Sequence, residues 1–282
     1  MKSNQHNMKP LWIFFLLSLL FVTLLAFPGI LLHYGLIQAE IPFIPLVVLG
    51  SWTPNIAAFL VIAFVIKQKG GIRKLFNRWT MWKAPIWWYL VAASPLLISA
   101  VAALLYHLID AQSNFSGDRP EYAMLFAFLI LSLITGAMGE ELGWRGFALP
   151  WVQTKFNALF ASLIIGLVWG IWHLPLWFTG MGWEDMSFWL FTYNCIAMSV
   201  IFTWICNSTR GNMVLVTLFH MFYNFGFGLM GELWNVPADK GILYLSIMLT
   251  LYATAILIVY GPVSLSKNRA IPVDKDTKEW IT

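Results

Sequence analysis

The chain has 282 residues, of which 60% are hydrophobic and only 11% are charged, and its formal net charge is +4. This composition, with a mean hydropathy of +0.73, excludes a water-soluble globular domain and indicates an integral membrane protein. The pI near 9.0 does not indicate nucleic-acid binding, because the sequence has no basic stripe interleaved with stacking aromatic residues.

Helices that cross a bilayer need about 20 largely apolar residues each. Eight stretches meet this requirement, at roughly 10–32, 42–66, 86–109, 122–147, 157–178, 187–206, 211–231 and 241–263. The predicted fold is therefore all-α, a polytopic membrane protein with about eight transmembrane helices in a single domain, residues 1–282. The polar tail from about residue 264 is expected to be flexible.

The basic residues predict an orientation. If the N-terminus is cytoplasmic and the connections alternate, all 17 Lys and Arg residues except Arg119 and Lys240 fall on the cytoplasmic side. This positive-inside bias predicts a multi-pass protein of the cell membrane with both termini cytoplasmic. The connection from Lys67 to Lys83 has apolar residues at helical spacing, which favours an interfacial amphipathic helix over a solvated loop.

Two adjacent acids, Glu140 and Glu141, lie in the fourth stretch. A charged residue inside a membrane helix costs roughly 2.5–3.5 kcal/mol on insertion scales, and such residues usually mark a function. Successive helical residues point about 100° apart, so both acids cannot face one cavity equally. The i, i+4 spacing of Glu141 and Arg145 favours an ion pair that leaves Glu140 for the cavity. The reverse assignment stays open, as does a Glu–Arg pair without a catalytic role.

Two histidines, His173 and His220, lie in later apolar stretches, and Asn224 follows His220 by one helical turn. An imidazole and an amide on one helical face can donate to one oxygen, as a developing oxyanion requires, although an interhelical polar clamp is an alternative. Counted along straight helices, His173 lies about 24 Å from the cytoplasmic end and His220 about 14 Å. These depths agree only if a helix is tilted or broken, as expected near Pro175.

The sequence lacks the residues that other classes of membrane protease require. It contains no H-E-x-x-H motif, no intramembrane pair of aspartates and no serine in a nucleophile elbow. Water activated by glutamate and histidine remains, since a carboxylate in a medium of low dielectric constant is a stronger base than in water.

The pattern Glu140-Glu141-x-x-Trp144-Arg145-Gly146, then Trp169-x-x-x-His173 and His220-x-x-x-Asn224, resembles the CAAX protease and bacteriocin-processing (CPBP, or Abi) family of intramembrane endopeptidases. The likeness covers roughly residues 120–230, so the catalytic helices are placed at about 120–231. The family usually has Phe where Trp169 stands, a difference expected to alter packing more than chemistry. The resemblance implies a multi-helix fold with a polar intramembrane cavity and hydrolysis of a peptide bond.

By the same resemblance, Glu140 and His173 activate water, while His220 and Asn224 stabilise the oxyanion. Glu141 and Arg145 support this site. Two alternatives stay open for the cofactor. The enzyme uses none, or it uses a divalent metal such as zinc, for which Glu140, His173 and His220 could supply ligands. We favour metal-free chemistry because Asn224 fits an oxyanion donor.

The expected partners are the lipid bilayer and a membrane-embedded or lipidated protein or peptide, which includes CAAX-like substrates, and no nucleic acid. We expect the cavity to open to the cytoplasm. Two other functions stay open on the sequence: a proton- or metal-coupled transporter, since transporters also use Glu and His within membranes, and a non-catalytic bacteriocin-immunity protein.

Overall fold

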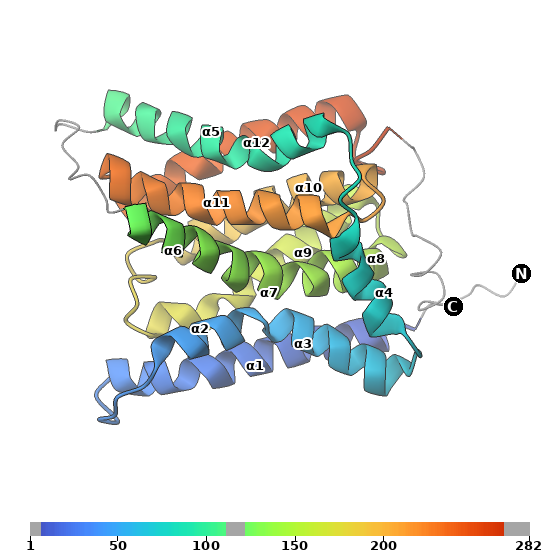
Figure 1. The fold of residues 1–282 in the computed structure, drawn as a ribbon, viewed down its shortest axis with the longest axis horizontal. Coiled ribbons are helices and arrows are strands. Elements are labelled where there is room, and N and C mark those ends of the chain that lie inside the picture. Colours follow the sequence, from blue (N-terminus) through green and yellow to red (C-terminus); the bar gives the residue numbers. More distant parts are fainter. Residues whose placement is uncertain (1–6, 111–121, 268–282) are drawn as a thin grey trace, which may run out of the picture.

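The computed structural model describes residues 7–110 and 122–267. These residues are almost all helical and contain no strand. Within these two ranges, seven helices are long and apolar enough to cross a membrane, and a bent pair of shorter helices adds an eighth span. The predicted all-α, polytopic fold is therefore confirmed (Figure 1). The predicted tail lies outside the described residues apart from 264–267, of which Ser264–Ser266 are buried.

The helical segments follow the predicted stretches closely. The spans are, in chain order, α1 (Lys9–His33); α2 (Phe43–Ser51) with α3 (Thr53–Leu60) and η1 (Val61–Ile66); α5 (Ile86–Ile109); α6 (Tyr122–Ser132) with η3 (Leu133–Ala137), α7 (Met138–Glu141), η4 (Leu142–Ala148) and α8 (Leu149–Gln153); α9 (Ala158–Trp172) with η5 (Leu174–Phe178); α10 (Phe188–Ser208); α11 (Met213–Trp234); and α12 (Ala238–Tyr260). Between the second and third spans lie α4 (Gly71–Asn77) and η2 (Arg78–Thr80).

Two spans are broken, and the two breaks lie next to each other. The second bends by 48° between α2 and α3, where Pro54 cannot donate a backbone hydrogen bond. The fourth was predicted as one continuous helix, but Thr135 and Gly136 leave the helical conformation, and Gly136 has φ +42°. A positive φ is readily adopted by glycine alone. The Trp52 indole, at the first bend, donates to the Ile134 carbonyl at the second, 2.9 Å away.

The segment predicted as an amphipathic helix forms α4 and η2, which pack across one end of the bundle (Figure 1). Leu75 is fully buried, and a Cβ atom on Gly146 would lie 2.7 Å from its side chain. Arg78 donates to the Gly146 carbonyl, and the Trp79 indole donates to Thr217. The helix is thus anchored to the fourth and seventh spans.

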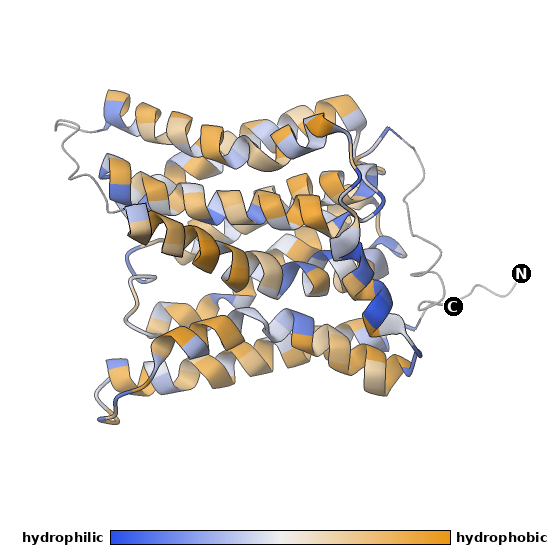
Figure 2. Ribbon diagram, in the orientation of Figure 1, coloured by the Kyte–Doolittle hydropathy of each residue, from blue (hydrophilic) through white to orange (hydrophobic). Residues whose placement is uncertain are grey.

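The helices lie side by side with α7, α8 and α9 between the α1–α3 layer and the layer of α5, α10, α11 and α12 (Figure 1). Large apolar side chains such as Leu16, Ile44, Leu97 and Ile258 are exposed on the outside. Figure 2 shows that hydrophilic residues gather at α4 and in the centre, around α7. A bundle with an apolar exterior and a polar interior fits a bilayer environment.

The two ends of the bundle can be told apart by their contacts. At one end, which we call the basic end, Asn212 donates to the Met81 carbonyl and Asn207 to the Ser264 carbonyl. This joins the α4 region, the α10–α11 turn and the end of α12. At the opposite end, the acidic end, His107 lies 2.6 Å from the Trp234 carbonyl and Lys240 pairs with Asp110. The α9–α10 loop lies at that end.

Candidate active site

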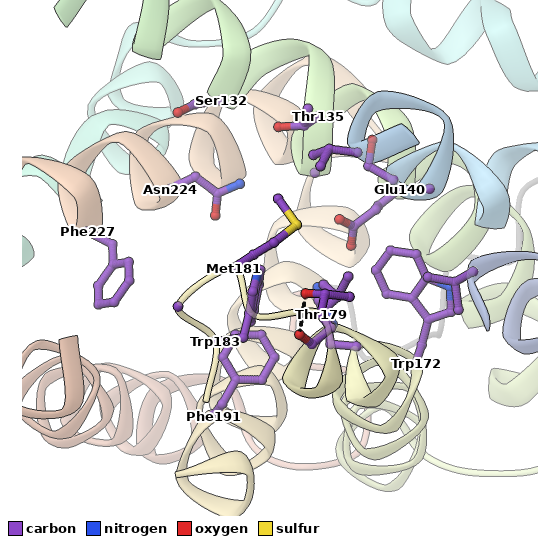
Figure 3. Close-up of a pocket in the computed structure, with 18 of the residues that line it drawn as sticks. Ser132, Thr135, Glu140, Trp172, Thr179, Met181, Trp183, Phe191, Asn224 and Phe227 are labelled. Atoms are coloured by element: carbon purple, nitrogen blue, oxygen red, sulfur yellow. Dashed lines mark hydrogen bonds between the residues drawn. The ribbon is translucent and has the colours of Figure 1, made fainter. Parts of the chain in front are cut away.

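A cavity of about 440 Å³ opens into the bundle between α1 and α2 on one side and α10 and α11 on the other. Its wall is largely apolar, and its polar residues include Glu140, His173, His220 and Asn224. Four of the six residues predicted for the site therefore line one pocket. Figure 3 shows Glu140 and Asn224 on either side of the Met181 side chain in this view.

Glu140 and Glu141 point in different directions, as the helical geometry predicted. Glu140 lines the pocket, whereas Glu141 is fully buried behind it. Glu141 Oε1 accepts from Arg145 Nη1 at 3.2 Å, one helical turn away. Of the two acids, Glu140 is thus the one that can meet a substrate. Removing a single partner of a buried ion pair costs about 3–5 kcal/mol, since it leaves an uncompensated charge, so loss of Glu141 or Arg145 alone is expected to destabilise this segment.

Glu141 also holds His220. Its Oε1 atom lies 2.7 Å from His220 Nδ1, and because a carboxylate accepts, Nδ1 is the donor. The Arg145 guanidinium lies between the rings of Trp169 and Phe202, 4.3 Å from each ring centroid. Arg145 therefore lies behind the pocket without lining it, with its charged guanidinium stacked on the two rings.

The Glu140 carboxylate accepts a hydrogen bond from the indole N–H of Trp169. The difference from the usual Phe was expected to affect packing more than chemistry. The structure adds a hydrogen bond to this difference, because a phenyl ring in the same place has no N–H to donate. The indole fixes Oε2 of the carboxylate, so Oε1 is left to face the pocket.

His173 lies where α9 ends, and this explains the mismatch in depth. Its backbone caps the helix, and the chain continues as the 3-10 turn η5 instead of as a straight α-helix. The ring stands against Phe191 and Trp183 in the pocket wall, with centroids 4.9 and 5.7 Å away. Nδ1 lies 2.9 Å from the Trp169 carbonyl and so is the donor, which in a neutral ring makes Nε2 an acceptor.

Three polar atoms from two spans converge on the space beside Gly136. Their distances from a Cβ atom built on that glycine are 2.6 Å for Asn224 Nδ2, 3.3 Å for His220 Nε2 and 3.5 Å for Glu140 Oε1. Only a residue without a side chain leaves this space open. A group of atomic size placed here meets two nitrogens, from an amide and an imidazole, and one carboxylate oxygen.

The helix that carries both acids is held in place by Asn55 of α3. Its Nδ2 atom donates to the Met138 carbonyl at 2.7 Å, and its Oδ1 atom accepts from the Gly143 backbone N–H at 2.8 Å. A Cβ atom on Gly143 would lie 2.6 Å from the backbone of Pro54. The helix α3 thus fixes the position of α7 although it supplies no predicted catalytic group.

The described side chains around the cavity do not form a metal site. Among residues 7–110 and 122–267, no group of three or more His, Cys, Asp and Glu side chains has a geometry that could hold a metal ion. The predicted ligand set of Glu140, His173 and His220 does not form such a group. The described residues therefore do not fit a zinc ion at this place.

The cavity reaches the acidic end of the bundle. Phe43 of α2 and Met181 of the α9–α10 loop both line it and are both exposed. Toward the basic end, the fully buried rings of Phe202, Phe219 and Trp144 close the space. The two expectations of cytoplasmic termini and a cytoplasm-facing cavity are therefore incompatible, since the α4 end and the cavity mouth lie on opposite sides.

Sequence reasoning missed three parts of this site: the Trp169 hydrogen bond, the break at Gly136 and the Met181 side chain in the pocket. The Gly136 break had a signal in Thr135-Gly136, a β-branched residue and a glycine in an otherwise apolar helix. The place of Met181 depends on a loop path that no local pattern specifies.

Two comparisons with known proteins agree with this geometry. Residues 121–226 match the family model of the Rce1-like type II CAAX prenyl endopeptidases. The chain is also 26% identical over 266 residues to CAAX prenyl protease 2 of Methanococcus maripaludis, covering 90% of this chain and 95% of that protein. The matched region contains every residue predicted for the site. The chain is therefore similar to the Rce1-like endopeptidases over this region, and it is an intramembrane endopeptidase.

Proposed function

We propose that the protein hydrolyses a peptide bond close to the membrane anchor of a membrane-embedded or lipidated protein or peptide, the class to which CAAX-type substrates belong. The convergence of Glu140, His220 and Asn224 beside Gly136 carries this proposal. The largely apolar wall of the same cavity supports an apolar or lipid-bearing substrate.

In the proposed reaction, a water molecule is held between Glu140 Oε1 and His173 Nε2. Glu140 takes a proton from this water while the oxygen bonds to the substrate carbonyl carbon. General-base assistance of this kind contributes about 10²- to 10⁴-fold to a rate. When the C–N bond breaks, the proton passes from Glu140 to the leaving amine, which restores the carboxylate.

The carbonyl oxygen becomes an oxyanion in the proposed intermediate, and Asn224 Nδ2 and His220 Nε2 donate to it. Since His220 Nδ1 already donates to Glu141, the ring carries a proton on both nitrogens when it acts this way. Glu141 and Arg145 thus act through His220 and do not touch the substrate.

For the membrane orientation, we propose that the basic end is cytoplasmic. Lys67, Lys69, Arg73 and Lys74 lie at this end, and Lys and Arg concentrate on the cytoplasmic side of membrane proteins. The start of α1 and the end of α12 lie at the same end (Figure 1).

The test uses purified protein in detergent with a lipid-anchored peptide and mass spectrometry of the products. Glu140→Gln, His173→Ala and Asn224→Ala are each expected to lower kcat by about 10²-fold or more, as loss of a base or an oxyanion donor does. Glu232→Gln, a change of an exposed acid outside the pocket, is the matched control. If Glu140→Gln cleaves as fast as the parent, Glu140 is not the base.

In cells, membrane proteomes with the parent and with Glu140→Gln should differ by one new peptide terminus. That terminus identifies the substrate and the bond.

A further inference from the structure

A second polar pair lines the cavity, apart from the groups proposed for the chemistry. Tyr223 of α11 and Asn194 of α10 both belong to the cavity wall, with 7% and 1% of their surfaces exposed. The Tyr223 hydroxyl donates to Asn194 Oδ1 at 2.6 Å. Neither residue takes part in the hydrolysis proposed above.

The hydrogen bonds behind this pair fix the direction of each bond within it. Ser246 Oγ of α12 donates to the Ile242 carbonyl at 2.7 Å, so its oxygen accepts from Asn194 Nδ2 at 3.1 Å. Asn194 Oδ1 is then the acceptor for the Tyr223 hydroxyl hydrogen. The Tyr223 oxygen can therefore only accept from a further partner, while Asn194 Nδ2 has a second N–H to donate. No other described residue uses either capacity.

Other hydroxyl groups in the cavity wall are bonded differently. Ser51, Thr135 and Thr179 each donate to a backbone carbonyl three or four residues earlier in the chain. At the Tyr223–Asn194 pair, by contrast, an acceptor and a donor lie together in a largely apolar wall, where unused hydrogen-bonding capacity is costly. They match one residue of an extended peptide, whose N–H and C=O point to the same side.

The pair lies next to the groups proposed for catalysis. His220, Tyr223 and Asn224 share one face of α11, because helical residues three or four apart are neighbours, with about 5–6 Å between their Cβ atoms. An extended peptide advances about 3.3 Å per residue. A substrate residue bound at Tyr223 therefore lies within about two residues of the bond that is cleaved. Phe191 of α10 and Phe227 of α11, both in Figure 3, line the cavity one helical turn from the pair.

We propose that Tyr223 and Asn194 bind the backbone of an extended substrate beside the scissile bond. Tyr223 Oη accepts from the N–H of one substrate residue, and Asn194 Nδ2 donates to the C=O of the same residue. The inference rests on the proposed function and adds a binding site for the substrate main chain. Because these contacts do not involve substrate side chains, they set the position of the peptide relative to Glu140 and leave the side chains to the apolar wall.

Tyr223→Phe keeps the ring and removes the acceptor. We expect kcat/KM to fall about 3- to 10-fold, the usual effect of one neutral hydrogen bond, mainly through a higher KM. Ser246→Ala is the control, since it breaks the same series of hydrogen bonds at a residue that does not line the cavity. Both variants should lower the melting temperature, but Ser246→Ala should keep the KM of the parent. An equal rise of KM in both variants, or no rise in Tyr223→Phe, would overturn the inference.

A change in the substrate tests the contact directly. In lipid-anchored peptides, each backbone N–H near the scissile bond, but not that of the scissile bond itself, is replaced in turn by an ester oxygen. At one position the kcat/KM of the parent should fall by the factor expected for Tyr223→Phe. The same ester should cause no further loss in Tyr223→Phe, as in a double-mutant cycle.

Two results would overturn the inference: no loss at any ester position in the parent, or losses that add in full to that of Tyr223→Phe. If Tyr223→Phe does not fold, Asn194→Ala with a thioamide, which weakens the carbonyl acceptor, gives the same comparison. Failure of the parent to cleave any of the all-amide peptides would instead contradict the proposed function.

Discussion

At the scale of single residues, the active site depends on which oxygen of Glu140 is left unpaired. Trp169 occupies one carboxylate oxygen, and the other points to the space beside Gly136. The same indole also lies over the Arg145 guanidinium. We therefore propose that Trp169 positions Glu140, the proposed base, and links it to the buried ion pair behind it.

Trp169→Phe keeps a ring in this place but removes the N–H that orients Glu140. A hydrogen bond to a charged group contributes about 1.5–3 kcal/mol, which corresponds to a fall in kcat of about ten- to hundred-fold. KM should change little, since the indole reaches the substrate only through Glu140. Steady-state kinetics on the purified variant measures kcat and KM separately and so checks this prediction.

The matched control is Trp144→Phe. Trp144 is fully buried, and its indole nitrogen has no hydrogen-bond partner among the described residues. The same change there should leave kcat near that of the parent. Equal losses in both variants would show that Trp169 acts only through packing.

At the scale of elements, the break in the fourth span places the acids. The chain leaves the helical conformation at Thr135 and Gly136, and α7 begins after this break. Glu140 of α7 lines the cavity. Such breaks in membrane helices occur where neighbouring groups satisfy the freed backbone. The Trp52 indole on the Ile134 carbonyl is one such contact.

Gly136→Ala should abolish cleavage. The added Cβ atom would lie 2.6 Å from Asn224 Nδ2 and fill the space where the substrate carbonyl is expected. The positive φ adds a strain of about 1–3 kcal/mol, so the melting temperature should also fall. Activity and thermal unfolding are measured together.

Gly231→Ala is the control, because nothing lies within 4 Å of a Cβ atom there and its φ is not positive. It should retain the activity and melting temperature of the parent. A Gly136→Ala protein that is folded and cleaves at the rate of the parent would contradict the position given to the reaction centre.

At the scale of the whole molecule, the cavity combines a small polar centre with a large apolar wall. We expect single-chain amphiphiles to inhibit cleavage competitively. Burial of each added methylene contributes about 0.8 kcal/mol to the binding free energy, which is about four-fold in affinity, until the chain fills the cavity. Inhibition constants for an alkyl phosphocholine series, measured below micelle formation, check this. Inhibition independent of chain length would contradict it.

Much of this molecule could be predicted from the sequence. The eight spans were predicted, because a stretch of about 20 apolar residues has few other stable states. The division between Glu140 and Glu141 was also predicted, because helical geometry and the i, i+4 partner Arg145 are local. The end of α9 at His173 was expected from the nearby Pro175, whereas the break at Gly136 and the direction of the cavity were not predicted. They depend on contacts between segments distant in the sequence, such as Trp52 with Ile134.

The cavity wall is built from two parts of the chain with different tasks. All groups proposed for the chemistry lie between Glu140 and Asn224, inside the region matched by the family model. Val22, Ala26, Phe43 and Val47, which lie outside that region, line the same cavity. Substitutions in α1 and α2 can therefore reshape what the enzyme accepts while the hydrolytic apparatus stays the same. Selectivity and reactivity are thus free to evolve separately, and substrates could be reprogrammed from the N-terminal helices alone.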